Sequence, residues 1–164
     1  MKSREAGRFR RVVRDLSGPK AVSRVLARTL HHADRFVFEA TNGRRTASSL
    51  LTGLPIVMLI TTGAKSGKKR TLPLLGILDG EDIIVVASGY GQTKYPAWYH
   101  NLRANPEARI YVEGMTRDVR AREAEGVERE RLWRRGVKVF PGWDAFQQRA
   151  SNRRIPVIIL SGIT

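Results

Sequence analysis

A glycine-containing segment rich in cations is the first candidate site. Residues 63–70 read GAKSGKKR, so eight positions hold two glycines, a serine hydroxyl and four cations. Glycines let backbone N–H groups approach an anion, and cations neutralise its charge. The segment departs from the nucleotide-binding P-loop, because its second glycine follows the first by four residues and Lys69 stands where Ser or Thr is required. The pattern predicts a phosphate site, with a solvated basic turn as the alternative.

A second candidate is a short aromatic segment with an amide beside it. Trp98 and Tyr99 can stack on a flat ring, and Asn101 can hydrogen-bond to it. Packing of a short helix against the core is the alternative interpretation of the same residues.

A third candidate is a group of aromatic residues near the C-terminal end. Phe140, Trp143 and Phe146 recur at three-residue steps, which places their rings on one side of a loop and the helical turn after it. Such a group predicts the wall of an apolar pocket. The alternative is the buried face of a docked helix.

Other kinds of catalytic site have little support in the sequence. The histidines form no ligand-like cluster with carboxylates, so no metal site is predicted. No Ser-His-Asp arrangement is legible, and Ser88-Gly89 lacks the pattern of a nucleophile elbow. The absence of cysteine excludes disulfides, thiolate metal ligands and cysteine nucleophiles.

The elements that position these residues follow two hydrophobic patterns. Apolar residues recur at three- and four-residue steps over about residues 20–41, which predicts an amphipathic helix after a basic arm. Short apolar or alternating runs predict six strands, at 56–62, 71–78, 82–88, 108–113, 116–123 and 155–161. Three further helices are predicted at 96–104, 126–139 and 143–150.

Tight turns decide how the predicted strands pair. Asp79-Gly80 and Gly114 lie between successive strands, and such short connections join antiparallel neighbours. The predicted fold is mostly β with flanking helices (α+β), a small antiparallel barrel closed by the C-terminal strand. Residues 1–41 are predicted to form a basic arm and amphipathic helix, and residues 42–164 the barrel domain.

Composition limits the class of protein and its partners. A chain of 164 residues with 41% hydrophobic residues fits one domain with a real core. The net charge is +15, and residues 1–50 contain 12 basic and 4 acidic side chains, so the charge is lopsided. Such a field attracts nucleic acid, anionic lipid or a small polyanion. No apolar run approaches the ~20 residues of a membrane-spanning helix and no secretory signal is evident, so we expect a cytoplasmic protein.

Several segments together resemble one protein family. Residues 61–67 (TTGAKSG), with Arg70 and Pro73-Leu74, resemble a TTTGRKSG…R…PL signature. Residues 86–88 (VAS) and 96–106 (PAWYHNLRANP) resemble a second signature, and Arg154-Ile155-Pro156-Val157 resembles an RxIPV terminus. Over about residues 42–160, the chain resembles the deazaflavin-dependent nitroreductase and quinone reductase family of actinobacteria, which uses coenzyme F420.

The resemblance implies a split β-barrel of the flavin-binding type and coenzyme F420, an 8-hydroxy-5-deazaflavin with a phosphate and an oligoglutamate tail. Carried onto this chain, Lys65, Ser66 and Arg70 hold the phosphate and Ala64 adds backbone contacts. One side of the ring is then lined by Thr71, Leu72, Pro73, Leu74, Leu75, Val86, Ala87, Ser88 and Gly89. The other side is lined by Ala97, Trp98, Tyr99, His100 and Asn101.

Two departures from the family pattern concern charge and proton supply. Ala64 stands where the family often has Arg, and Lys68 or Lys69 replaces that cation. The aromatic group at 140–146 stands where better-studied members have tyrosines, so its rings can stack on a substrate but cannot protonate it. The proton is expected from solvent, or from Tyr99 or His100.

The leading hypothesis is an oxidoreductase that passes a hydride from reduced F420 to an apolar acceptor stacked on the aromatic group. A quinone is the first choice of acceptor, with a nitroaromatic or an enone as alternatives. The rival hypothesis is a non-catalytic carrier of deazaflavin or another flavin, and FMN is the less favoured cofactor.

Three further expectations concern partners. The basic arm and the helix are predicted to lie on an anionic membrane surface, the inner face of the cell membrane, with packing on the barrel as the alternative. Nucleic acid is disfavoured, because only Phe9 interleaves with the cations of the arm. The protein is expected to be a monomer or a homodimer.

Overall fold

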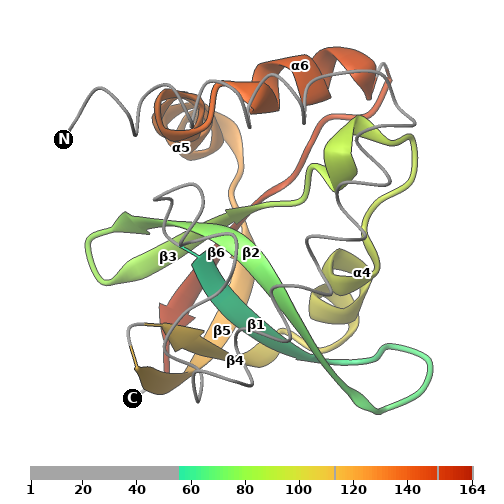
Figure 1. The fold of residues 1–164 in the computed structure, drawn as a ribbon, viewed down its shortest axis with the longest axis vertical. Helices are drawn as coiled ribbons and strands as arrows, with labels where there is room; N and C mark the ends of the chain where they lie inside the picture. The colour runs from blue at the N-terminus through green and yellow to red at the C-terminus, as the bar shows by residue number, and fades with distance from the viewer. Residues whose placement is uncertain (1–55, 113, 151, 164) are drawn as a thin grey trace, which may run out of the picture.

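Six antiparallel strands form a closed barrel in the order β1-β2-β3-β6-β5-β4 (Figure 1). The structure is a computed structural model that describes residues 56–112, 114–150 and 152–163. The strands are β1 (Ile56–Thr62), β2 (Lys69–Asp79), β3 (Asp82–Val86), β4 (Glu107–Val112), β5 (Met115–Glu123) and β6 (Val157–Gly162). The predicted fold class and the closure of the barrel by the last strand are confirmed.

The turns follow from their residues. Asp79 pairs with Asp82, which leaves a two-residue loop between β2 and β3, and Gly80 in that loop adopts φ +67°. This left-handed conformation carries no steric cost in glycine, and it suits a tight hairpin. At the other end of β2, the strand begins two residues earlier than predicted, because Lys69 pairs with Thr62. The hairpin that carries the cationic segment is therefore paired up to its turn.

Alternation along β3 and β6 divides the core into two clusters. Ile83 and Val85 of β3 pack with Ile158 and Leu160 of β6 and with residues of every other strand, so this cluster fills the barrel. Helix α4 (Ala97–Ala104) adds the side chains of three residues to the same cluster, namely Trp98, Tyr99 and Leu102. The short helix therefore packs against the barrel interior, at the right of the barrel in Figure 1.

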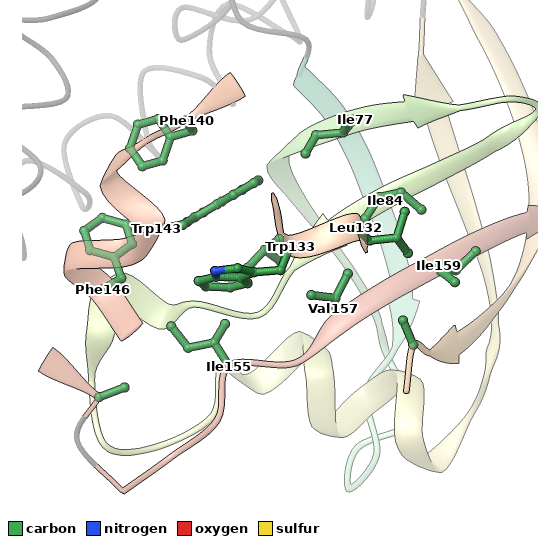
Figure 2. Packing of buried hydrophobic residues seen from close by; sticks show 13 residues of the cluster. Ile77, Ile84, Leu132, Trp133, Phe140, Trp143, Phe146, Ile155, Val157 and Ile159 are labelled. Carbon is green, nitrogen blue, oxygen red and sulfur yellow. The ribbon is translucent and has the colours of Figure 1, made fainter. Parts of the chain in front are cut away.

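The other face of β3 and β6 is covered by two helices, α5 (Gly126–Val139) and α6 (Gly142–Arg149). Ile84 and Ile159 pack there with Leu132 and Trp133 of α5 and Trp143 of α6 (Figure 2). The Trp133 indole N–H also donates to Asp144 Oδ1 at 3.2 Å. The two helices therefore form one layer over this face of the sheet, at the top of Figure 1.

The predicted N-terminal arm and helix, residues 1–41, lie outside the described residues, as does the predicted boundary between residues 41 and 42. Within the described ranges, no helix is long and apolar enough to cross a membrane.

Candidate functional site

The cationic segment forms a closed loop between β1 and β2. The Gly63 N–H donates to the Lys68 carbonyl and the Gly67 N–H donates to the Gly63 carbonyl, both at 2.8 Å. The Ser66 hydroxyl accepts the Lys68 N–H at 3.3 Å, which leaves its own hydrogen to donate. Lys65, Ser66 and Arg70, the residues predicted to hold the phosphate, are all exposed, so a ligand can reach them. Ala64, predicted to add backbone contacts, is exposed too, but its N–H already donates to Asn101.

The positive charge of this loop is largely uncompensated. No ion pair between two described residues involves Lys65, Lys68 or Arg70. Lys69 donates to the Thr62 hydroxyl at 2.9 Å. The pKa of Asp118 is lowered mainly by its hydrogen bond to Arg109 and to a smaller extent by the nearby charge of Lys69. The loop therefore suits an anionic ligand.

Asn101 holds this loop against α4. Its Oδ1 accepts the Ala64 backbone N–H at 3.0 Å, and its Nδ2 donates to the Thr61 hydroxyl at 3.0 Å. The residue is 9% exposed, and Thr61 is fully buried. Asn101 was predicted to contact the ring of the cofactor. In the structure, its amide holds the Ala64 backbone and so positions the cationic loop. Asn101 therefore affects a ligand of the loop indirectly, through Ala64.

The hydroxyl of Tyr99 forms a hydrogen bond to a side chain of β5. Its hydroxyl donates to Glu123 Oε2 at 2.7 Å, and burial together with this carboxylate raises the pKa of Tyr99 to about 12. A phenol with that pKa holds its proton near neutral pH and is a poor proton donor. His100 beside it is exposed, with its ring centroid 5.8 Å from that of Tyr99, and remains the other candidate donor.

The other residues predicted to line the ring differ in exposure. Three of them are buried: Val86 lies in the cluster under α5 and α6, and Ala87 and Trp98 lie in the cluster that fills the barrel. Six more are half-buried, namely Leu72, Pro73, Leu74, Leu75, Ser88 and Gly89, and Thr71 and Ala97 are exposed. Their contact with a cofactor stays a prediction.

The turn η1 (Gly89–Gly91) follows β3 and has a left-handed backbone. Its φ values are +54° at Gly89, +57° at Tyr90 and +74° at Gly91. A Cβ on Gly91 would lie 2.8 Å from the Phe146 carbonyl oxygen, so the turn packs directly against α6. The opposite end of the same loop leads through Pro96 into α4.

Arg153 holds this loop in place through hydrogen bonds to its backbone carbonyls, and this residue was not among the predicted site residues. Its guanidinium donates to the carbonyls of Ala87, Ser88 and Gln92 at 2.8–3.2 Å, and it stacks on Tyr95 with 4.7 Å to the ring centroid. Burial lowers the pKa of this guanidinium from its usual value. The signal was present in the sequence, because RxIPV spacing places the arginine two residues before Ile155, at position 153.

Arg154, which was matched to that terminus instead, lies at the surface and pairs with Glu130. Its side chain is 64% exposed, so it contributes little to the loop that Arg153 holds.

The aromatic group is buried. Phe140, Trp143 and Phe146 are 5%, 4% and 2% exposed and belong to the cluster under α5 and α6. Figure 2 shows Trp143 projecting from α6 toward the strands, where it lies over Gly136 and Ile77. The Phe140 ring is 5.8 Å from that of Trp143 and 5.9 Å from that of Phe146. The helix-packing interpretation thus describes these rings, and their contact with an acceptor stays a prediction.

Contacts connect four segments that carry predicted site residues, which we together call the wall: the cationic loop, α4, the loop bonded to Arg153, and α6. The cationic loop is bonded to α4 through Asn101, and α4 follows the loop that Arg153 holds. Gly91 in that loop then packs on α6. The exposed cationic loop lies at one end of this series, and the buried aromatic group lies at the other. No cluster of His, Asp and Glu that could hold a metal occurs among the described residues.

A closed antiparallel β-barrel with an exposed cationic loop between β1 and β2 defines the class of fold. The sequence profile of the F420H(2)-dependent quinone reductase family matches residues 28–162, and the chain belongs to this family. Its sequence is 34% identical over 135 residues to the F420H(2)-dependent quinone reductase Rv1261c of Mycobacterium tuberculosis, which covers 80% of this chain and 87% of that protein.

Two solved structures resemble this chain in both sequence and fold. One is an F420-H2 dependent reductase, FDR-A, with 42% identity and a TM-score of 0.61 over 65% of this chain and 94% of that one. The other is a domain-swapped dimer, with 35% identity and a TM-score of 0.64 over 87% of this chain and all of the other.

Proposed function

We propose that this protein transfers a hydride from reduced coenzyme F420 to a quinone, with the cofactor bound along the wall from the cationic loop to the turn η1. Membership of the F420H(2)-dependent quinone reductase family supports the reaction. The uncompensated charge of Lys65, Lys68 and Arg70 is the observation that carries the placement of the cofactor.

The cationic loop binds the phosphate of the cofactor. Lys65 and Arg70 neutralise its charge, and the Ser66 hydroxyl donates a hydrogen bond to it. Because Asn101 fixes the Ala64 backbone, the loop is held in place before the ligand arrives, which reduces the entropy lost on binding.

When bound, reduced F420 supplies a hydride from C5 of its ring, and a quinone that takes this hydride and one proton becomes the hydroquinone. The protein binds and orients the two molecules and excludes water from the space between them. The proton comes from solvent or from His100, since Tyr99 donates to Glu123 and its pKa is about 12.

We also propose that residues 1–41 bring this site to a lipid-soluble quinone at an anionic membrane surface. The support is the surplus of 12 basic over 4 acidic side chains in residues 1–50.

Titration of the purified protein with oxidised F420, beside FMN, tests the cofactor assignment. We expect binding of F420 and much weaker binding of FMN. Oxidation of reduced F420 is then followed with menadione and with a nitroaromatic compound. Binding of F420 without faster oxidation by any acceptor would contradict the enzyme and support a carrier.

A further inference from the structure

Tyr90 adopts a backbone conformation that bulky residues rarely take. Its φ is +57°, and it is the one residue other than glycine with a positive φ among the described residues. A side chain in the left-handed region clashes with its own backbone, and such strained residues gather at binding and catalytic sites. Glycine would fit this position without strain, so the tyrosine lowers the stability of the folded protein at this position.

The surroundings of Tyr90 prevent the turn from relaxing. Arg153 bonds the carbonyls of Ser88 and Gln92, one on each side of the turn. Gly91 lies against the backbone of α6 with no room for a Cβ. The turn is therefore fixed from both ends, and the direction of the Tyr90 side chain is fixed with it.

The Tyr90 ring stands at the edge of the buried aromatic group. Its ring centroid is 6.0 Å from that of Phe146, in an edge-to-face arrangement with 67° between the planes. Tyr90 is 40% exposed, whereas Phe146 is 2% exposed. Part of the Tyr90 side chain is therefore accessible to a ligand, and the buried Phe146 ring packs against it.

Tyr90 also follows the predicted ring-lining segment directly. Ser88 and Gly89 lie one and two residues before it, so its ring stands where the cofactor wall meets the aromatic group. Because Tyr90 is exposed and the rings of the 140–146 group are buried, an acceptor at this side of the molecule would meet Tyr90 first.

We propose that Tyr90 is the specificity-determining residue for the acceptor, and that its ring, supported by Phe146, stacks on planar aromatic acceptors. This inference rests on the proposed function. In this proposal, the acceptor stacks on Tyr90 and not on the buried rings of Phe140, Trp143 and Phe146.

The test compares Tyr90→Gly and Tyr90→Phe with the wild type. Glycine suits the positive φ, so the fold is retained, and an unchanged or higher melting temperature checks this point. Equilibrium binding of menadione is measured by calorimetry without cofactor, and KM and kcat for menadione are measured with reduced F420. Tyr111→Phe is a matched control for Tyr90→Phe, since it changes a half-buried tyrosine on β4, a strand that carries none of the proposed site residues.

We expect Tyr90→Gly to weaken menadione binding about tenfold and to raise KM by a similar factor, because a stacked aromatic contact is lost. Tyr90→Phe keeps the aromatic ring and loses only the hydroxyl, so it should bind menadione as the wild type does. Unchanged menadione binding in Tyr90→Gly, or an equal loss in Tyr90→Phe, would overturn the stacking role. A wild type that fails to bind F420 would instead contradict the proposed function, since menadione binding is read without the cofactor.

Discussion

The side-chain amide of Asn101 accepts the backbone N–H of Ala64 at 3.0 Å, across 37 residues of sequence. This contact joins α4 to the cationic loop, and the same amide reaches the Thr61 hydroxyl at the end of β1. The position of the loop relative to the barrel thus depends on one buried side chain.

We therefore expect Asn101→Ala to lower both stability and cofactor affinity. The change leaves the Ala64 N–H and the Thr61 hydroxyl without their partner, and a loss of about 1–3 kcal/mol in the free energy of unfolding follows. Urea unfolding and titration with F420 measure the two effects. Thr61→Val is the matched variant, because it removes only the bond to Thr61. Equal loss of F420 affinity in both variants would contradict the role of the bond to Ala64.

Lys65→Ala and Arg70→Ala should each weaken F420 binding by ~1.5–3 kcal/mol, the usual scale of a charged hydrogen bond. Both side chains are exposed, so the melting temperature should stay unchanged. Fluorescence titration of F420 at several salt concentrations gives the affinity and its dependence on charge. Arg134→Ala, an exposed arginine on α5, controls for net charge. Affinity unchanged in both loop variants would show that the phosphate is held elsewhere.

Replacement of Arg153 by lysine should destabilise the protein by about 2–4 kcal/mol, because one ammonium cannot satisfy the carbonyls of Ala87, Ser88 and Gln92. Arg154→Ala removes only an exposed ion pair with Glu130 and should cost no more than about 1 kcal/mol. Denaturant midpoints of the two variants give the comparison. A larger effect at Arg154 would contradict the assignment of the structural arginine to position 153.

Stability at high pH should depend on Tyr99. Its pKa in the folded protein is about 12, above the ordinary value of 10.0, so the folded state keeps a proton that the unfolded chain releases between these values. The contribution of Tyr99 is therefore complete below pH 10 and is lost as pH rises toward 12. In Tyr99→Phe, urea midpoints should be lower at pH 7 and fall less steeply above pH 10. An identical slope in both proteins would contradict the raised pKa of Tyr99, which burial and the hydrogen bond to Glu123 produce together.

Reversal of charge in the N-terminal arm tests the membrane proposal with the full chain. Changing Arg8, Arg10 and Arg11 to Glu should abolish co-sedimentation with vesicles that contain anionic lipid, since each basic residue near such a surface contributes about 1 kcal/mol. Vesicles of neutral lipid are the control. Equal sedimentation of the variant and the wild type on anionic vesicles would end the membrane proposal.

The sequence predicted the barrel because its signals are local. The apolar run of β3 and the Asp79-Gly80 turn are each contained in a few residues, and together they define a hairpin. The cationic loop was also found from eight consecutive residues. The family resemblance then supplied the cofactor, which charge alone could not distinguish from other anions.

The parts of the site that escaped prediction depend on contacts between distant residues. The bond of Tyr99 to Glu123 and that of Arg153 to Ala87 span 24 and 66 residues. The burial of Phe146 agrees with the docked-helix alternative given for its spacing, but its packing beside η1 is another contact between distant residues. The strained backbone of Tyr90 follows from the same packing, and residues 89–91 alone indicated only a loop.

The place of β6 between β3 and β5 has a consequence for how the protein is made. Until this strand leaves the ribosome, the nascent polypeptide exposes two unpaired sheet edges, each able to recruit a strand from another molecule. Pairing of β6 with β3 and β5 is thus the step that closes the barrel, and a polypeptide that ends shortly before Val157 would be prone to aggregation.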